Sequence, residues 1–277
     1  MPRHFTTSRA TNFYYSFLFL PRPKRRAIEA VYAFARRGDD LADGNLTPEE
    51  ARREIVRYRK VLEQGYSGAP ADGPPELEAL AEAVRSYRIP RQHFEDLILG
   101  LEMDLSGSRY ETFDDLAKYC YRVASTIGLI SIEIFGYRNP RTRDYAVNLG
   151  IALQLVNILR DLRSDARRGR TYIPCQDFER FGVRPEELAL GSGGEAPARL
   201  IEFECDRACH YFDLARQALP PEDRRSMIAA EIMAAIYWRL LGVIRRRSSL
   251  SGGRVRLSRP LKFWTALSVY LGAEWHE

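Results

Sequence analysis

Apolar residues recur at three- and four-residue intervals along most of the chain, and no stretch shows sustained alternation of apolar and polar positions. The first spacing is that of one face of an α-helix, whereas alternation would indicate β-strands. The pattern therefore predicts an all-α fold. The expected helices cover residues 24–43, 49–64, 75–87, 91–105, 113–135, 141–168, 199–218 and 222–247.

Proline and glycine residues lie between these segments and predict loops there. The breaks fall at Pro21 and Pro23, at residues 65–75, at Asn139-Pro140, at residues 184–198 and at residues 251–253. No repeat or low-complexity linker divides the chain. We therefore expect a single domain over residues 1–277.

Three aspartates crowd the end of the first long helix. Asp39 and Asp43 are four residues apart and Asp40 and Asp43 are three apart, so all three lie on one helical surface. Like charges repel, and Arg36, four residues before Asp40, supplies part of the counter-charge. Hard oxygen ligands in such a cluster suit Mg²⁺. A solvated acidic helix end is the alternative for this motif taken alone.

A second polar group runs along the expected helix 141–168. Gln154, Asn157, Asp161, Asp165 and Arg168 follow one another at spacings of three, four, four and three residues, which draws one stripe down the helix. Such a stripe often marks the solvent face of an amphipathic helix. Here the flanking positions are apolar nearly all round, which favours a buried helix whose amides and carboxylates find partners inside.

Two buried aspartate helices that face each other would create a strong negative field, so cations are expected between them. With Mg²⁺ bound, the pocket becomes a receptor for anions. Four arginines are then available as diphosphate donors: Arg36, Arg160, Arg168 and Arg170.

The overall composition limits which classes of partner the protein is expected to bind. The formal charge of +5 is too small an excess of basic residues to indicate that the protein binds nucleic acid. With a pI near 9.0, the chain is suited to bind anionic ligands or an acidic membrane surface. No apolar run approaches the roughly 20 residues that cross a bilayer, so any membrane contact is expected to be peripheral. The four cysteines lack framework spacing and no signal peptide is evident, which favours a reducing cytoplasm without disulfides. Cys205, Cys209 and His210 lack a fourth ligand and are not expected to bind metal.

Several motifs resemble the paired aspartate motifs of squalene and phytoene synthases. They are Asp39-Asp40-x-x-Asp43, Asn157-Ile-Leu-Arg160-Asp161-x-x-x-Asp165 and Arg170-Thr-Tyr172-Ile-Pro174. The similarity extends to Phe13-Tyr-Tyr-Ser-Phe17, Ala30-Val-Tyr32-Ala-Phe34, Gly100-Leu-Glu-Met-Asp104-Leu and Tyr119-Cys-Tyr121-Arg-Val-Ala, within a core of about residues 10–260. The resemblance implies an isoprenoid-synthase helical bundle with a central cavity between two aspartate-rich helices.

Within that family, the motifs are most similar to the bacterial hopanoid-pathway enzyme that joins two farnesyl diphosphates into presqualene diphosphate. The alternatives are phytoene synthase, which uses geranylgeranyl diphosphate, and a complete squalene or dehydrosqualene synthase. The resemblance implies two or three Mg²⁺ ions, and NADPH is not expected if the product is presqualene diphosphate. Enzymes that form squalene from this product are the implied downstream partners.

The resemblance also implies roles for particular residues. The implied metal ligands are Asp39, Asp40, Asp43, Asn157, Asp161 and Asp165. The implied substrate-binding residues are Phe13, Tyr32, Arg36, Gln154, Asn157, Arg160, Arg170, Tyr172 and Tyr237. Asp39, Asp43, Asp161 and Asp165 serve catalysis through the metal, and Tyr121 handles the proton lost on cyclopropane closure, with the diphosphate as an alternative base.

Smaller features concern the substrate chain and the first phosphate site. Ser125 and Gly128 follow Tyr121 at spacings of four and three residues, a small-residue face along which a prenyl chain would lie. Ser125 stands where many relatives have glycine. The family commonly has Ser-x-Ser before its first aromatic residue, whereas this chain has Ala10-Thr11-Asn12.

Two alternative functions, from other classes of protein, remain. A helical scaffold or assembly factor without catalysis would have lost its aspartates, yet all five are present. A basic protein of the membrane surface is suggested by the run Arg245-Arg246-Arg247 and by Arg254, Arg256 and Arg259. Such runs more often end solvated helices or face phosphate.

Overall fold

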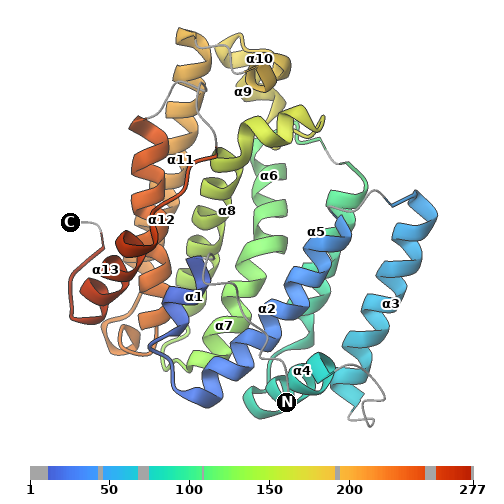
Figure 1. Ribbon diagram of the computed structural model, residues 1–277, viewed down its shortest axis with the longest axis vertical. Helices are drawn as coiled ribbons and strands as arrows, with labels where there is room; N and C mark the ends of the chain where they lie inside the picture. Colours follow the sequence, from blue (N-terminus) through green and yellow to red (C-terminus); the bar gives the residue numbers. More distant parts are fainter. Residues whose placement is uncertain are drawn as a thin grey trace.

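A computed structural model describes residues 12–42, 46–67, 75–107, 109–190, 194–246 and 254–275. Within these ranges all regular structure is helical, which confirms the predicted all-α class (Figure 1). The helices are α1 (Asn12–Phe17), α2 (Arg22–Ala42), α3 (Pro48–Ser67), α4 (Pro75–Tyr87), α5 (Arg91–Leu105), α6 (Phe113–Cys120), η1 (Tyr121–Ser125), α7 (Thr126–Phe135), α8 (Thr142–Arg167), α9 (Cys175–Phe181), α10 (Pro185–Leu190), α11 (Glu195–Ala218), η2 (Pro221–Asp223), α12 (Ile228–Arg246) and α13 (Arg259–Tyr270).

The predicted helix at 113–135 is interrupted by a π-helical segment. This segment, η1, spans Tyr121–Ser125 between α6 and α7. A π turn inserts one residue into the helical spiral and is frequent at functional sites. The interruption shifts the direction of the side chains that follow it.

Other differences from the predicted elements concern short or capped segments. The last long helix begins at Ile228 rather than near 222, because the prolines at 220 and 221 start the short 3₁₀ turn η2. The loop expected at 184–198 contains α10 and the first turn of α11. Short helices such as α1 and α9 offer too few turns for hydrophobic periodicity to reveal them, and α13 was not among the predicted helices.

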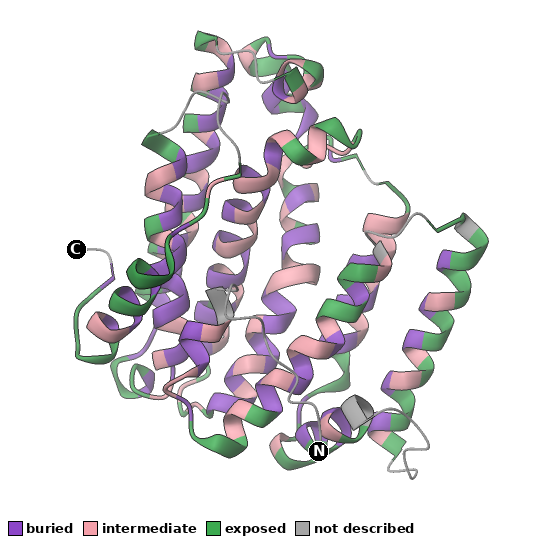
Figure 2. Cartoon of the chain, in the orientation of Figure 1, coloured by how far each residue is buried: buried purple, intermediate pink, exposed green. Residues whose placement is uncertain are grey.

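Helix α8 lies in the middle of the bundle, packed on α7 and η1 on one side and on α11 and α12 on the other (Figure 1). Its apolar residues are buried on several sides, as Figure 2 shows by the purple bands along the helix. This confirms the prediction that α8 is a buried helix.

Small residues allow α7 and η1 to approach α8 closely. A Cβ atom on Gly150 would lie 2.5 Å from the Cα of Ser125, and one on Gly128 would lie 2.7 Å from the carbonyl oxygen of Ala146. The hydroxyl of Ser125 donates a hydrogen bond to the carbonyl of Val147 at 2.7 Å. Ser125 and Gly128 therefore serve helix–helix packing, and the prediction that they form a face for a prenyl chain is wrong.

The chain reverses direction where α8 ends. The backbone N–H groups of Arg168 and Arg170 both donate to the carbonyl of Asp165, at 2.9 Å each, and Gly169 between them has a φ of 72°. This left-handed glycine is a common helix terminator. The turn sends the following residues, including Tyr172, back toward the body of the bundle.

Within the described ranges, no helix combines the length and the apolar character needed to cross a membrane. All four cysteines are free thiols.

Candidate active site

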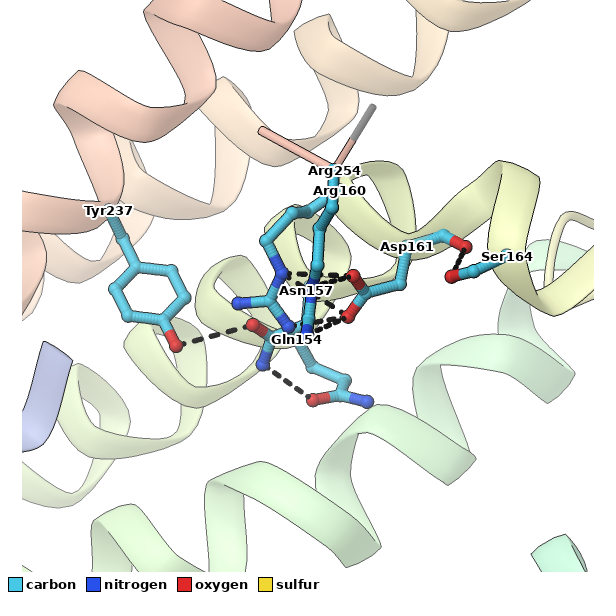
Figure 3. A network of polar contacts seen from close by, with 7 residues as sticks. All are labelled: Gln154, Asn157, Arg160, Asp161, Ser164, Tyr237 and Arg254. Atoms are coloured by element: carbon cyan, nitrogen blue, oxygen red, sulfur yellow. Dashed lines mark hydrogen bonds and ion pairs between the residues drawn. The ribbon is translucent and has the colours of Figure 1, made fainter. Parts of the chain in front are cut away.

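The polar stripe of α8 is half-buried from Gln154 to Asp165, and Arg168 at its end is exposed. The amide of Asn157 donates to the side-chain oxygen of Gln154 at 3.2 Å (Figure 3). The hydroxyl of Tyr237, a buried residue of α12, donates to the other side of Asn157 at 3.2 Å. The two contacts fix the orientation of the Asn157 amide and join α8 to α12.

Asp161 is held by two arginines at the next turn of α8. Arg160 donates to both carboxylate oxygens through Nε, at 3.1 and 3.2 Å, and Arg254 reaches the same oxygens at 2.6 and 2.8 Å (Figure 3). Burial acts to raise the pKa of Asp161, but the bonds from Arg160 and Arg254 outweigh burial and hold the pKa below its usual value. The carboxylate is therefore ionised at neutral pH, with two positive groups beside one negative group.

The aspartates of α2 lie in a different environment. Asp40 pairs with Arg36 at 3.0 Å, as predicted, but their side chains are 60% and 73% exposed. Asp39 is also exposed. The expectation that both aspartate helices bury their carboxylates is therefore wrong for α2, because these residues lie at the end of the helix, where fewer neighbours cover them.

Tyr32 is a half-buried residue of α2. Burial raises its pKa well above the usual value, and the nearby Tyr237 and the charge of Asp39 raise it further. Its ring lies 5.3 Å from that of Phe17. Tyr237, which bonds to Asn157, therefore lies close enough to Tyr32 to act on its pKa.

Part of the predicted site falls outside the described residues. Asp43, Ala10 and Thr11 lie outside those ranges, and so do the side chains of Asn12 and Phe13. Their roles remain predictions.

A second group of polar side chains centres on Asp104, and the sequence analysis did not predict that these residues meet. The hydroxyls of Tyr119 on α6 and Tyr172 after α8 both donate to Asp104 on α5, at 3.1 and 3.0 Å. The two rings stack with their centroids 5.3 Å apart. Burial raises the pKa of Tyr172, and the charges of Asp104 and Asp165 act on it in the same direction. The group therefore adjoins the Asp165 end of α8. Its signal in the sequence lay in the motifs around Asp104 and Tyr119.

Tyr121 is placed elsewhere. Burial raises its pKa, and the charges that act on it are those of Asp96 on α5 and Arg143 in the first turn of α8. Tyr119 bonds to Asp104, whereas the charges that act on Tyr121 belong to Asp96 and Arg143. Residues two apart on a helix point in different directions, and this explains the contrast. The role of Tyr121 remains a prediction.

The residues present suit Mg²⁺ by their donor chemistry. Carboxylate and amide oxygens are the ligands that this hard cation prefers, and Asp161 is ionised as a ligand must be. Among the described side chains, no three of the types His, Cys, Asp and Glu already form a metal-binding arrangement, and this holds for Cys205, Cys209 and His210 as well. The magnesium site remains a prediction.

Comparison with known proteins identifies relatives over nearly the whole chain. The family model for squalene/phytoene synthase matches residues 6–260. The phytoene synthase of Mycobacterium tuberculosis is 42% identical over 258 residues, which cover 89% of this chain and 84% of that protein. The 15-cis-phytoene synthase of Synechocystis sp. is 34% identical over 286 residues, covering 99% and 83%.

Solved structures show the same architecture. A dehydrosqualene synthase in complex with ligand superposes with a TM-score of 0.85 at 29% identity, over 96% of this chain and 92% of the other. The squalene synthase HpnC from Alicyclobacillus acidocaldarius superposes with a TM-score of 0.74 at 29% identity, over 86% and 89%. These similarities confirm the predicted isoprenoid-synthase type of fold.

Proposed function

Since this chain belongs to the squalene/phytoene synthase family, we propose that it joins two prenyl diphosphates head to head, and in particular two geranylgeranyl diphosphates into phytoene. The named relatives in sequence are phytoene synthases, which favours the alternative of the sequence analysis over the presqualene diphosphate reading. Presqualene diphosphate formation from farnesyl diphosphate is the second candidate, because the superposed structures are a dehydrosqualene and a squalene synthase.

The observation that carries the proposal is the ionised Asp161 with two arginines within the half-buried polar stripe of α8. Arg160 and Arg254 are planar donors suited to the oxygens of a diphosphate. Asp39, Asp40, Asp43, Asn157, Asp161 and Asp165 would hold Mg²⁺. When bound, Mg²⁺ neutralises the charge that develops on a departing diphosphate.

The remaining residues hold the reactants and exclude water. Tyr237 and Gln154 orient the Asn157 amide, so that this group does not reorganise during the reaction. The buried rings of Phe17 and Tyr237 and the half-buried ring of Tyr32 offer apolar surface and aromatic faces that stabilise a carbocation by roughly 0.5–2 kcal/mol each. A cation kept from water is not lost to hydrolysis.

The proton lost on cyclopropane closure needs a base. Burial raises the pKa of Tyr119 and of Tyr121, so both phenols stay protonated and act as hydrogen-bond donors. The departing diphosphate is therefore the better candidate base. Tyr119 instead holds Asp104, which also binds Tyr172.

Product analysis tests the function. Purified protein is incubated with Mg²⁺ and either farnesyl or geranylgeranyl diphosphate, with and without NADPH, and products are identified by mass. A C40 hydrocarbon from geranylgeranyl diphosphate without reductant is the expected result. A C30 diphosphate from farnesyl diphosphate moves the assignment to presqualene diphosphate synthesis, and no condensation with either substrate overturns the proposal.

A further inference from the structure

Helix α13 buries one side against the bundle and carries apolar residues on the opposite side. Its inner side packs on the bundle through the buried residues Lys262, Thr265, Ala266 and Val269. The opposite side carries Pro260, Phe263, Trp264, Leu267 and Leu271, which recur at three- and four-residue spacing and so share one face. We call these five residues the α13 outer face. An ordinary surface helix would place polar residues there.

The outer face is exposed to an unusual degree. Phe263, Trp264 and Leu271 are 43%, 63% and 75% exposed. Among the described residues, eight large hydrophobic side chains are exposed, and five of them fall between Leu261 and Leu271. Single exposed apolar residues are common, but a contiguous group marks an interaction surface. Figure 1 shows α13 on the outer side of the bundle beside α12.

The positive charge around the outer face indicates which kind of partner it binds. From Arg254 to Leu271 the chain contains four basic residues and no acidic residue. Arg256 and Arg259 are exposed. Tryptophan and tyrosine favour the boundary between lipid headgroups and acyl chains, and flanking arginines are attracted to anionic lipids. A symmetric dimer would instead set this basic patch against itself, with no carboxylate in the segment to pair with it.

We propose that the α13 outer face docks this protein on a bilayer that contains anionic lipids. The helix lies in the plane of the interface, with Phe263 and Trp264 inserted among the lipids and with Arg256 and Arg259 at the headgroups.

The docking helix is continuous with the candidate active site. Arg254, at the start of the segment that leads into α13, bonds to Asp161. On the inner side of α13, burial and the charges of Arg160, Arg256 and Arg259 lower the pKa of Lys262. A bilayer beneath α13 therefore lies next to the arginines that would receive a diphosphate. If the proposed function holds, that is where prenyl substrates partition and where an insoluble product leaves.

Vesicle sedimentation with the full chain tests the proposal. The vesicles consist of phosphatidylcholine alone or of equal parts phosphatidylcholine and phosphatidylglycerol. We expect binding to the mixed vesicles, at least ten-fold weaker binding for Phe263→Ser/Trp264→Ser, and weaker binding at high salt. Val56→Ser is the matched control, because Val56 on α3 is 67% exposed and lies outside the outer face.

Tryptophan fluorescence gives a second readout. Of the three tryptophans, Trp264 is the most exposed, whereas Trp238 is half-buried and Trp275 is buried. Mixed vesicles should shift the emission of the unmodified chain to shorter wavelength, and Trp264→Phe should abolish the shift while binding persists. Equal binding by the unmodified chain and Phe263→Ser/Trp264→Ser overturns the proposal. So does a dimer that the double substitution dissociates, with no vesicle binding by the unmodified chain. Binding is measured without turnover, so its failure and the failure of the condensation assay are distinguishable.

Discussion

The Asp161 site and a cluster around Arg207 contain the same residue types in opposite proportion. At the Asp161 site, one carboxylate meets two arginines. In the other cluster, Arg207 alone serves two buried carboxylates, Asp177 and Glu204, each with a contact of 2.8 Å. The Arg207 cluster is almost wholly buried and the Asp161 site is partly open to solvent through Arg254, so the two regions differ in exposure as well as in the count of counter-charges.

The pKa values of Asp161 and Glu204 follow the number of arginines beside each carboxylate. Burial acts to raise the pKa of Asp161, and the two arginines overcome it. Burial raises the pKa of Glu204 to about 7, and the neighbouring Asp177 adds to the effect while Arg207 opposes it. A site with surplus positive charge is prepared to receive an anion, whereas a cluster with surplus carboxylate has no charge to offer a diphosphate. The Arg207 cluster therefore holds α9 to α11, and the Asp161 site remains available for substrate.

The largest expected effect concerns Arg207→Ala. The substitution leaves two buried carboxylates without a cation and removes the guanidinium stacked 4.1 Å from the ring of Phe113. Breaking a buried ion pair from one side costs about 3–5 kcal/mol. Denaturant titration should show a loss of that order in the free energy of unfolding. A change within about 0.5 kcal/mol, as at ordinary surface positions, would contradict the structural role of the cluster.

Asp161→Asn tests the other region. Losing the carboxylate removes a proposed metal ligand and frees Arg160 and Arg254 from their shared partner. Loss of one preorganised charge in an active site typically lowers kcat by about 10²–10³-fold. Turnover of geranylgeranyl diphosphate should fall by that factor, while thermal unfolding, measured alongside, changes little. Normal turnover would show that Asp161 is only structural.

The helices and the partial burial of the α8 stripe could be predicted from the sequence, because long amphipathic segments and the apolar surroundings of Gln154 and Asn157 are local patterns. The contact between Arg254 and Asp161 joins residues 93 positions apart, so no local spacing reveals it. The same holds for Asp104, whose two tyrosine partners come from different elements. The π turn changes no residue type and therefore left no periodic signal.

Glu204→Gln tests how the stability of the Arg207 cluster depends on pH. The pKa of Glu204 is near 7 in the folded state and near 4.5 for an ordinary glutamate, so the folded state binds the proton more tightly. The stabilisation is complete below the lower pKa and is lost as the pH rises through the higher one. Unfolding free energies should therefore fall with a slope of up to about 1.4 kcal/mol per pH unit over this window. In the glutamine variant the slope should flatten, and an unchanged slope would assign the pH dependence to other groups.

The smallest expected effect concerns Arg254→Met, which reduces the Asp161 site to one arginine and one carboxylate. Bonds between charged groups contribute about 1.5–3 kcal/mol, and the Arg254 side chain is 48% exposed, which favours the lower end of that range. We expect kcat/KM to fall about ten-fold in detergent-solubilised assays. Arg246→Met, an exposed arginine at the end of α12, is the matched control and should not change kcat/KM. Equal values for the two variants would mean that Arg160 alone keeps Asp161 charged, and that surplus positive charge is not what distinguishes this site from the Arg207 cluster.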